Sequence, residues 1–214
     1  MLIPIVTAGG YDITLEDLRK PFDIKFNDID ENLFEGRVWP PGHDSAGKPI
    51  VLRDYQVEAV NEYLRNPQAI QEISTAAGKT IITAGLSRMV EKITNGRTII
   101  IVPNKSLIGQ TEKDYINVGL DVGVYFGDRK DIGKQHTICT WQSLGILSEK
   151  GSIDGLNLME AFLDKVNCVI VDECHLAKAA VLRKLLTGPF ANVPLRWGMT
   201  GTIPEEDFQQ VSLL

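Results

Sequence analysis

The chain has 214 residues, of which 43% are hydrophobic and 23% are charged, and this length and composition predict one globular domain with a small appendage. A net charge of −6 argues against a domain that coats nucleic acid by charge alone. No apolar run approaches the roughly 18 residues of a membrane span, and the first residues lack the pattern of a signal peptide. We therefore expect a cytoplasmic protein without a membrane partner.

The first 49 residues differ from the rest of the chain, because prolines and glycines interrupt any long hydrophobic periodicity. These interruptions include Pro21, Pro40, Pro41 and Pro49. We expect residues 1–49 to form a small, irregular N-terminal appendage whose last part, 37–49, is a connector. Residues 50–214 are expected to form the main domain.

Strand-like and helix-like segments then alternate, which is typical of an α/β protein with a parallel sheet covered by helices on both faces. Strands are expected over 68–73, 98–103, 121–126, 136–140, 167–172 and 195–199. Helices are expected over 53–65, 79–94, 105–117, 155–165 and 176–187. The runs 97–102 and 167–171 are rich in β-branched residues, which predicts central strands buried on both faces.

A phosphate-binding loop is predicted between the first expected strand and its helix. The sequence TAAGKT runs from Thr75 through Ala76, Ala77, Gly78 and Lys79 to Thr80. Its backbone N–H groups can cradle phosphates, Lys79 can contact the β and γ phosphates of ATP, and the Thr80 hydroxyl can bind Mg²⁺. The strict pattern has a glycine where this chain has Ile73, so the segment alone fits an ordinary helix start equally well.

Two acids lie at the end of the expected strand 167–172, in the sequence VIVDECH. Asp172 can hold Mg²⁺ through water, and Glu173 can orient or deprotonate the attacking water. A solvated acidic turn is the alternative interpretation. Because ligands of open α/β sheets lie at the carboxyl ends of strands, we expect these acids to lie close to Lys79, at a catalytic site for ATP hydrolysis.

Four further segments complete an ordered series of motifs. They are LRDYQ at 52–56, IVPNKSL at 101–107 with Gln110, CTWQSL at 139–144 and GMTGT at 198–202. With the two nucleotide motifs, this series resembles the first RecA-like motor domain of superfamily 2 helicases, which are P-loop NTPases, in a DEAH-like branch with a DECH variant. The amino-acid sequence around TWQS and DECHLA is most similar to that of phage UvsW-type DNA helicases.

The resemblance implies further roles at the nucleotide. Gln56 would read the adenine edge, while Arg53 would reach phosphate or adenine, or else be an exposed arginine at a helix end. His175 would couple the ATP site to the GMTGT motif, unless it is an ordinary loop hydrogen-bonder. The same motif would link the nucleotide to the domain cleft through Thr200, Gly201 and Thr202. An aromatic ring would stack on adenine, with Phe34, Trp39 and Tyr55 as alternatives.

The resemblance also implies a nucleic-acid strand at two strand-to-helix turns. The first turn offers Pro103, Asn104 and Lys105, and the second offers Thr140, Trp141 and Gln142. Backbone amides and hydroxyls at such turns can hold phosphates. Trp141 can stack on a base or lie in the core beneath the turn, and we favour the core slightly.

Together these motifs predict the motor domain of an ATP-dependent DNA helicase or translocase that acts on branched DNA or R-loops in recombination or repair. DNA is favoured over RNA, and the cytoplasm could be that of a phage-infected host. The motor part of a restriction-type complex and a non-hydrolysing nucleotide-binding module are the alternatives. Because the resemblance implies a second RecA-like domain with an arginine finger, this chain alone is expected to hydrolyse ATP weakly.

Overall fold

The computed structural model describes residues 24–74, 77–153, 156–178 and 180–202. Its main element is a seven-stranded sheet in the order β1-β9-β8-β2-β5-β3-β4. Every neighbouring pair in this sheet is parallel except β3 with β4. The bounds are β1 Gln68–Glu72, β2 Arg97–Val102, β3 Val122–Phe126, β4 Arg129–Lys130, β5 His136–Thr140, β8 Val166–Asp172 and β9 Leu195–Thr200. The predicted α/β class and parallel sheet are confirmed.

The two strands predicted to be central, β2 and β8, lie side by side in the middle of the sheet. All six residues of β2 are buried. Their side chains alternate between two core layers, with Ile100 and Val102 in one layer and Ile99 and Ile101 in the other. A strand with apolar side chains on both faces has to be covered on both sides.

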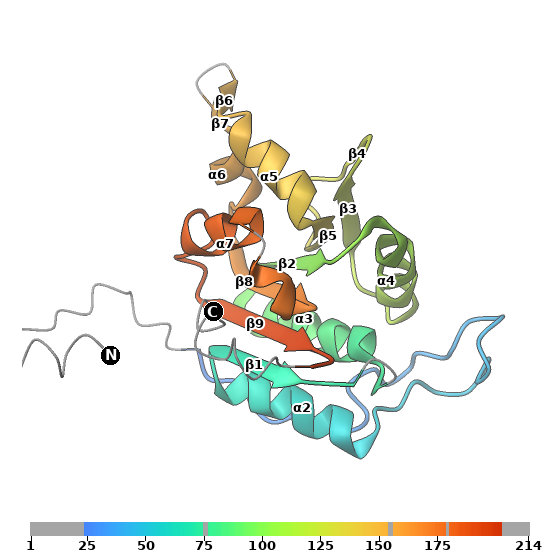
Figure 1. Ribbon diagram of the computed structural model, residues 1–214. Coiled ribbons are helices and arrows are strands. Elements are labelled where there is room, and N and C mark those ends of the chain that lie inside the picture. The colour runs from blue at the N-terminus through green and yellow to red at the C-terminus, as the bar shows by residue number, and fades with distance from the viewer. Residues whose placement is uncertain (1–23, 75–76, 154–155, 179, 203–214) are drawn as a thin grey trace, which may run out of the picture.

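Helices supply that cover, as Figure 1 shows. One layer contains α2 (Asp54–Arg65), α3 (Lys79–Thr94) and α4 (Lys105–Asn117), and the other contains α5 (Trp141–Glu149), α6 (Leu158–Phe162) and α7 (Ala180–Thr187). A 3₁₀ helix, η2 (Cys174–Lys178), joins β8 to α7. A hairpin of β6 (Ser152–Ile153) and β7 (Leu156–Asn157) projects at the far end of the molecule from β1.

The α5 region corrects our helix predictions. No helix was expected over 141–149, but α5 is continuous over these nine residues, and the side chain of Thr140 caps it by accepting from the backbone nitrogen of Ser143. A Cβ atom at Gly145 would lie 2.7 Å from Cγ1 of Val181 on α7, so a larger residue there would require Val181 to shift. The helix expected over 155–165 is wrong at both ends, because α6 spans only Leu158–Phe162. It begins there because the side chain of Asn157 caps the backbone N–H groups of Met159 and Glu160.

The helix expected over 176–187 is also corrected, since η2 and α7 take its place. Residues 24–53 contain turns and one isolated bridge between Val38 and Pro49, which agrees with an irregular appendage. Phe34 is nevertheless fully buried in the core layer that includes residues of α2 and α3. The boundary between an appendage and a main domain near residue 49 therefore stays a prediction.

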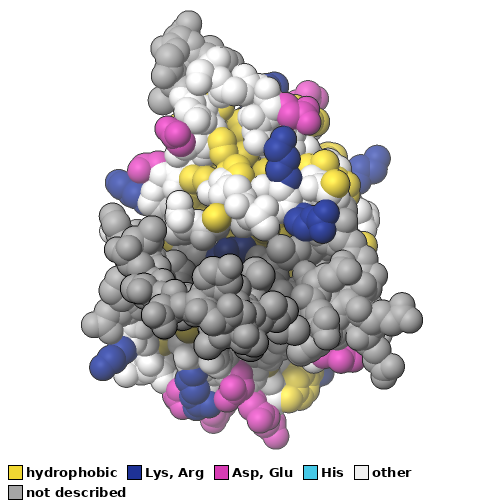
Figure 2. Space-filling view, turned by 60° about the vertical axis from the view of Figure 1, so that its left-hand side comes forward, with side chains coloured by type: hydrophobic (Ala, Val, Ile, Leu, Met, Phe, Trp, Pro, Cys, Tyr) yellow, Lys and Arg dark blue, Asp and Glu magenta, His cyan; other side chains and the backbone are white. Residues whose placement is uncertain are grey.

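Two further features of the structure concern the distribution of surface charge and the character of the helices. On the face shown in Figure 2, the basic side chains of the described residues are scattered among acidic and hydrophobic ones and form no continuous basic surface. Among the helices that the structure describes, none combines the length and apolar character that crossing a bilayer requires.

Candidate active site

The phosphate loop and the acidic motif meet at the carboxyl edge of the sheet. Lys79, the first residue of α3, is 8% exposed, and its ammonium group contacts the carboxylate of Glu173. The same Nζ atom lies 3.5 Å from Oδ1 of Asp172. The structure therefore places together three charged residues that the sequence predicted to lie close to each other.

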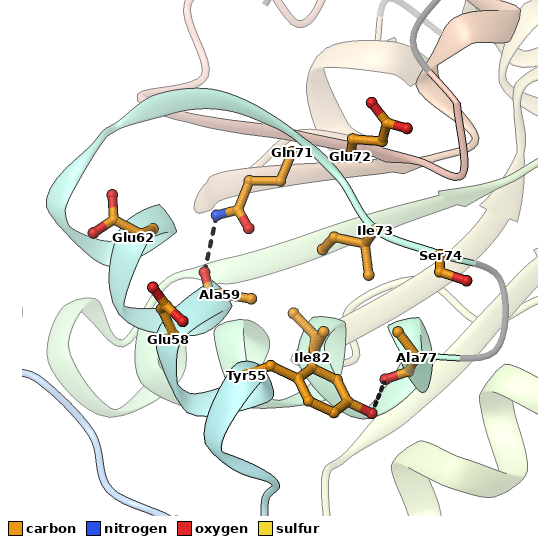
Figure 3. A pocket seen from close by; sticks show the side chains of 10 residues that line it. All are labelled: Tyr55, Glu58, Ala59, Glu62, Gln71, Glu72, Ile73, Ser74, Ala77 and Ile82. Atoms are coloured by element: carbon orange, nitrogen blue, oxygen red, sulfur yellow. Dashed lines mark hydrogen bonds between the residues drawn. The ribbon is translucent and has the colours of Figure 1, made fainter.

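The loop before α3 is held by the first turn of α2. Nε2 of Gln56 donates to the carbonyl oxygen of Ala77 at 3.0 Å. The hydroxyl of Tyr55 donates to the same oxygen at 3.2 Å, as Figure 3 shows. Gly78 has a left-handed φ of 75°, and a Cβ atom there would lie 2.8 Å from Nε2 of Gln56. A side chain at Gly78 is thus excluded both by the backbone angle and by space.

The predicted Arg53 lies just before α2 and is exposed. Its Nη1 donates to the Tyr55 hydroxyl at 2.9 Å, so within the described residues it approaches the loop through Tyr55. Thr75 and Ala76, which were also predicted to bind phosphate, lie outside the part of the chain that the structure describes.

Glu173 connects the phosphate loop to the end of β9. One carboxylate oxygen contacts Lys79, and the other, Oε2, lies 3.4 Å from both Oγ1 of Thr200 and the backbone nitrogen of Gly201. Nδ1 of His175 lies 3.3 Å from this Oε2 and 2.8 Å from Thr200 Oγ1. Glu173 also has a left-handed φ of 53°, an uncommon backbone angle for a residue with a side chain.

The predicted coupling motif is thereby in contact with the acids. Thr200 is the last residue of β9, and β9 pairs in parallel with β8, with Met199 opposite Asp172. The Thr200 hydroxyl also lies 2.9 Å from the carbonyl oxygen of Thr202. Glu173 is therefore in direct contact with the chain that follows β9.

The two acids have pKa values that move in opposite directions. Burial raises the pKa of the Asp172 carboxyl, and the negative charge of Glu173 adds to that rise, although Lys79 opposes it. Burial also acts to raise the pKa of Glu173, but the hydrogen bond and charge of Lys79 outweigh it and lower the pKa. Glu173 is therefore held as a carboxylate, the form that can accept a proton.

The chemistry of two oxygen-bearing side chains at this edge, those of Thr80 and Asp172, fits a magnesium ion. Among the described residues, no group of three His, Cys, Asp or Glu side chains could hold a metal by itself. Mg²⁺ typically takes one or two protein oxygens and completes its shell with water and substrate phosphates. Thr80 at the start of α3 and Asp172 at the end of β8 offer such oxygens.

The residues predicted to contact nucleic acid lie at two neighbouring helix starts. Val102 ends β2 and is paired with Thr140, which ends β5. The side chain of Asn104 caps α4 by accepting from the backbone nitrogens of Ser106 and Leu107, and Thr140 caps α5 by accepting from Ser143. Two helix N-termini therefore lie side by side at the same edge as the nucleotide motifs.

The individual side chains at these turns differ in exposure. Lys105 and Gln142 are exposed, Pro103 is half-buried and Thr140 is buried. Trp141 packs in part against the core layer of α5 and α7, and within the described chain its indole nitrogen is buried without a hydrogen-bond partner. This packing favours the core interpretation of Trp141 over base stacking.

The structure also narrows the choice of an aromatic ring for adenine. Phe34 has no exposed surface, so it is excluded. Tyr55 is 41% exposed beside the loop, and Trp39 is half-buried and stacked on His43 with ring centroids 4.0 Å apart. Either of these two rings remains available.

A pocket of 330 Å³ that sequence reasoning did not predict lies beside the loop, between α2 and β1 (Figure 3). Tyr55, Ser74 and Ala77 line its end near the loop. Its remaining wall includes three acidic side chains, those of Glu58, Glu62 and Glu72. Carboxylates disfavour the phosphates of a nucleotide, so the phosphates are expected at Lys79 and not here.

The fold resembles solved helicase structures. The crystal structure of the UvsW helicase from bacteriophage T4 superposes with a TM-score of 0.72 at 22% identity, covering 100% of this chain and 74% of the other. The SWI2/SNF2 ATPase core of Sulfolobus solfataricus in complex with double-stranded DNA gives 0.59 at 16% identity, covering 76% and 35%. The predicted RecA-like fold is confirmed by these similarities.

Sequence comparison points to the same group of proteins. A DNA 3'-5' translocase XPB2 from Sulfurisphaera tokodaii is 31% identical over 196 residues, which are 89% of this chain and 38% of that protein. The ATP-dependent DNA helicase uvsW of Enterobacteria phage T4 is 25% identical over 190 residues, 85% of this chain and 34% of that protein. The chain thus spans about a third of the length of these curated relatives.

The family comparison covers most of the chain. The model of the family described as type III restriction enzyme, res subunit, matches residues 49–205. This range includes both nucleotide motifs and the segments at 52–56, 101–107, 139–144 and 198–202. The resemblance to superfamily 2 helicases predicted from these motifs is confirmed, and the chain belongs to the type III restriction enzyme res subunit family.

Proposed function

We propose that this chain is the first motor domain of an ATP-dependent DNA helicase or translocase. The observation that carries the proposal is the bridge formed by Glu173, which contacts Lys79 of the phosphate loop with one oxygen and lies close to Thr200 with the other. A motor needs such a link, because the state of the nucleotide has to change the position of another part of the molecule. The names of the relatives, a DNA translocase and an ATP-dependent DNA helicase, support the same function.

In this proposal the phosphate loop binds the triphosphate of ATP. The backbone N–H groups of the loop, from Thr75 to Thr80, face the phosphates, and Lys79 leaves the carboxylates to contact the β and γ phosphates. Thr80 and Asp172 hold Mg²⁺, which neutralises phosphate charge when it is bound. Arg53 and Gln56 complete the nucleotide site from the start of α2.

Glu173 is the proposed general base. With Lys79 drawn to the phosphates, its carboxylate is released to orient the attacking water and accept its proton. His175, Thr200, Gly201 and Thr202 then respond to the change at Glu173, because they contact it directly or through Thr200.

The N-termini of α4 and α5 are the proposed site for one nucleic-acid strand. Free backbone N–H groups and the positive end of each helix dipole attract phosphate, and Asn104, Lys105, Thr140 and Gln142 lie at these ends. Such a site needs few positive charges, which agrees with a net charge of −6. Pro103 and Trp141 shape the two turns.

We further propose DNA as the nucleic acid, with branched DNA or R-loops as substrates in recombination or repair. The similarity to the phage helicase in sequence and in fold supports this choice and a location in the host cytoplasm. A second RecA-like domain in a longer protein would supply the arginine that completes the site, so this chain alone should turn over ATP slowly.

The motor part of a restriction-type complex is the second candidate, and the matching family model favours it. A nucleotide-binding module without turnover is disfavoured, because such a module has no use for a carboxylate held ionised beside the phosphate site.

The test is ATP turnover by this chain and by the product of the full reading frame, each without DNA, with single-stranded DNA and with forked DNA. We expect DNA to stimulate turnover strongly only in the longer protein, and forked DNA to be unwound. Stimulation without unwinding would favour the restriction-type motor. ATP binding without turnover in either protein would contradict the proposal.

A further inference from the structure

The buried hydroxyl of Tyr63 has no part in the proposed mechanism. Tyr63 lies on α2 and has no exposed surface. Its hydroxyl donates to the carbonyl oxygen of Gly198 on β9, and the backbone N–H of Gln71 on β1 interacts with the same hydroxyl. One side-chain oxygen therefore contacts two neighbouring strands of the sheet.

These two strands lead to the two parts of the site that a motor has to connect. The strand β1 continues through Ile73 into the phosphate loop, and β9 ends at Thr200, whose hydroxyl lies 3.4 Å from Oε2 of Glu173. Past the end of β1, the backbone nitrogen of Ile73 donates to the carbonyl oxygen of Thr200 at 2.7 Å. The pairing of β1 with β9 is consequently a direct connection between the phosphate loop and the GMTGT motif.

The ring of Tyr63 is also held against β9. It packs against the ring of Trp197 with centroids 5.9 Å apart, and the indole N–H of Trp197 donates to the carbonyl oxygen of Asn66, just after α2, at 2.8 Å. Burial raises the pKa of Tyr63 well above its ordinary value, so its hydroxyl stays protonated and remains a donor. The last turn of α2 thus holds Gly198, which is two residues before Thr200.

We propose that Tyr63 is a positioning residue of the GMTGT motif, whose hydroxyl keeps β9 aligned with β1 so that Thr200 responds to the state of the phosphate loop. This inference rests on the proposed function, because it requires that the motif passes the state of the nucleotide to the rest of the motor. It predicts that loss of the hydroxyl weakens the stimulation of ATP turnover by DNA. ATP should still bind normally, because the phosphate-binding residues keep their own contacts.

The experiment uses Tyr63→Phe in the product of the full reading frame, a change that removes the hydroxyl and keeps the ring against Trp197. Tyr115→Phe is the matched control, because Tyr115 is also fully buried and its hydroxyl bonds to Oγ of Ser87 at 3.0 Å, between α4 and α3. Calorimetry measures the affinity for a non-hydrolysable ATP analogue with Mg²⁺, and the melting temperature reports folding. Steady-state kinetics give kcat and KM for ATP with and without single-stranded DNA.

We expect the two variants to lose a similar, small amount of thermal stability, since each removes one buried hydrogen bond. Tyr63→Phe should also lower kcat in the presence of DNA by about three- to tenfold. Its KM, its turnover without DNA and its affinity for the analogue should be unchanged. Tyr115→Phe should keep the full stimulation by DNA.

The inference is overturned if DNA stimulates the two variants equally, because the hydroxyl would then contribute to stability alone. A loss of analogue affinity in Tyr63→Phe, or a failure of that variant to fold, would also overturn it, since either result makes the hydroxyl a structural requirement of the domain. A wild-type protein whose turnover does not respond to DNA would instead overturn the proposed function.

Discussion

The two edges of the main sheet use buried charge in different ways. At the carboxyl edge, the ammonium group of Lys79 forms ion pairs with the carboxylates of Asp172 and Glu173. At the amino edge, Arg97 begins β2 and is 7% exposed. Its guanidinium donates to three backbone carbonyl oxygens, those of Lys134, Phe162 and Asp164, at 2.9 to 3.0 Å.

This difference separates structural charge from functional charge. The acceptors of Arg97 are fixed parts of the backbone, so its hydrogen bonds hold the starts of neighbouring elements in one arrangement. Burial lowers the pKa of Arg97, but a guanidinium still keeps its proton in a folded protein. The ions at the carboxyl edge have other side chains as partners. In the function that we propose, phosphates displace those partners, so this edge changes its state when ATP binds.

The largest expected effect is on chemistry at the carboxyl edge. In the full-length protein, Glu173→Gln should lower ATP turnover by about 10² to 10⁴ because it removes the proton acceptor, while ATP still binds. Steady-state turnover and equilibrium binding measure the two quantities separately. Turnover within tenfold of the wild type would mean that Glu173 is a structural link only, like the acceptors of Arg97.

Lys79→Ala tests the exchange of partners at the same edge. Loss of a charge-assisted contact with the phosphates should weaken ATP binding by about 10- to 100-fold. The matched control is Lys105→Ala, a lysine at the start of α4 that we assign to nucleic acid. That variant should leave ATP affinity unchanged and weaken the binding of single-stranded DNA, and the reverse pattern would contradict the separation of the two sites.

Arg97→Met tests the amino edge. Removing the guanidinium leaves buried carbonyl oxygens without their donor and should lower the free energy of unfolding by about 3 kcal/mol, as measured by urea denaturation. Arg97→Lys should recover only part of this loss, because an ammonium group cannot reach several acceptors in a fork. ATP affinity of the folded protein should not change, and a matching loss of affinity would show that the two edges are not independent.

The sequence predicts features that depend on neighbouring residues better than features that depend on contacts between distant residues. The strands β2 and β8 and the loop at Gly78 follow from local patterns, since a run of apolar residues or a glycine before a lysine carries its own signal. The helix α5 was missed because it is only nine residues long and contains Gly145, and because the burial of Leu144 and Leu147 depends on packing against distant elements such as α7.

Long-range contacts also limited the prediction of the site. The sequence indicated that Lys79 and Glu173 would lie close together, since both motifs follow strands of one sheet. It gave no sign that the amide of Gln56 is directed at Ala77, 21 residues away. The pocket between α2 and β1 also depends on the packing of two elements and has no sequence signature.

The smallest expected effect concerns the free energy of unfolding and its dependence on pH. Burial raises the pKa of Asp172 above its ordinary value of 3.8, so the folded state binds its proton more tightly than the unfolded state does. The wild type therefore loses stability as the pH rises from the unfolded pKa through the folded pKa of this group. Asp172→Asn removes that loss and should melt at a slightly higher temperature than the wild type at pH 7, with a smaller difference at pH 4.

An acid at the amino edge supplies the control of opposite sign. Asp121, just before β3, has a lowered pKa because Lys134 donates a hydrogen bond to it. Its ionised form therefore stabilises the folded state at pH values above the unfolded pKa. This stabilisation is lost as the pH falls through the folded pKa. Asp121→Asn should thus melt slightly below the wild type at pH 7. If both variants melt at a lower temperature than the wild type, then Asp172 forms a structural ion pair, as Asp121 does at the amino edge. Opposite shifts would show that the carboxyl edge keeps a charge that folding alone disfavours, as expected of a group retained for binding a metal ion.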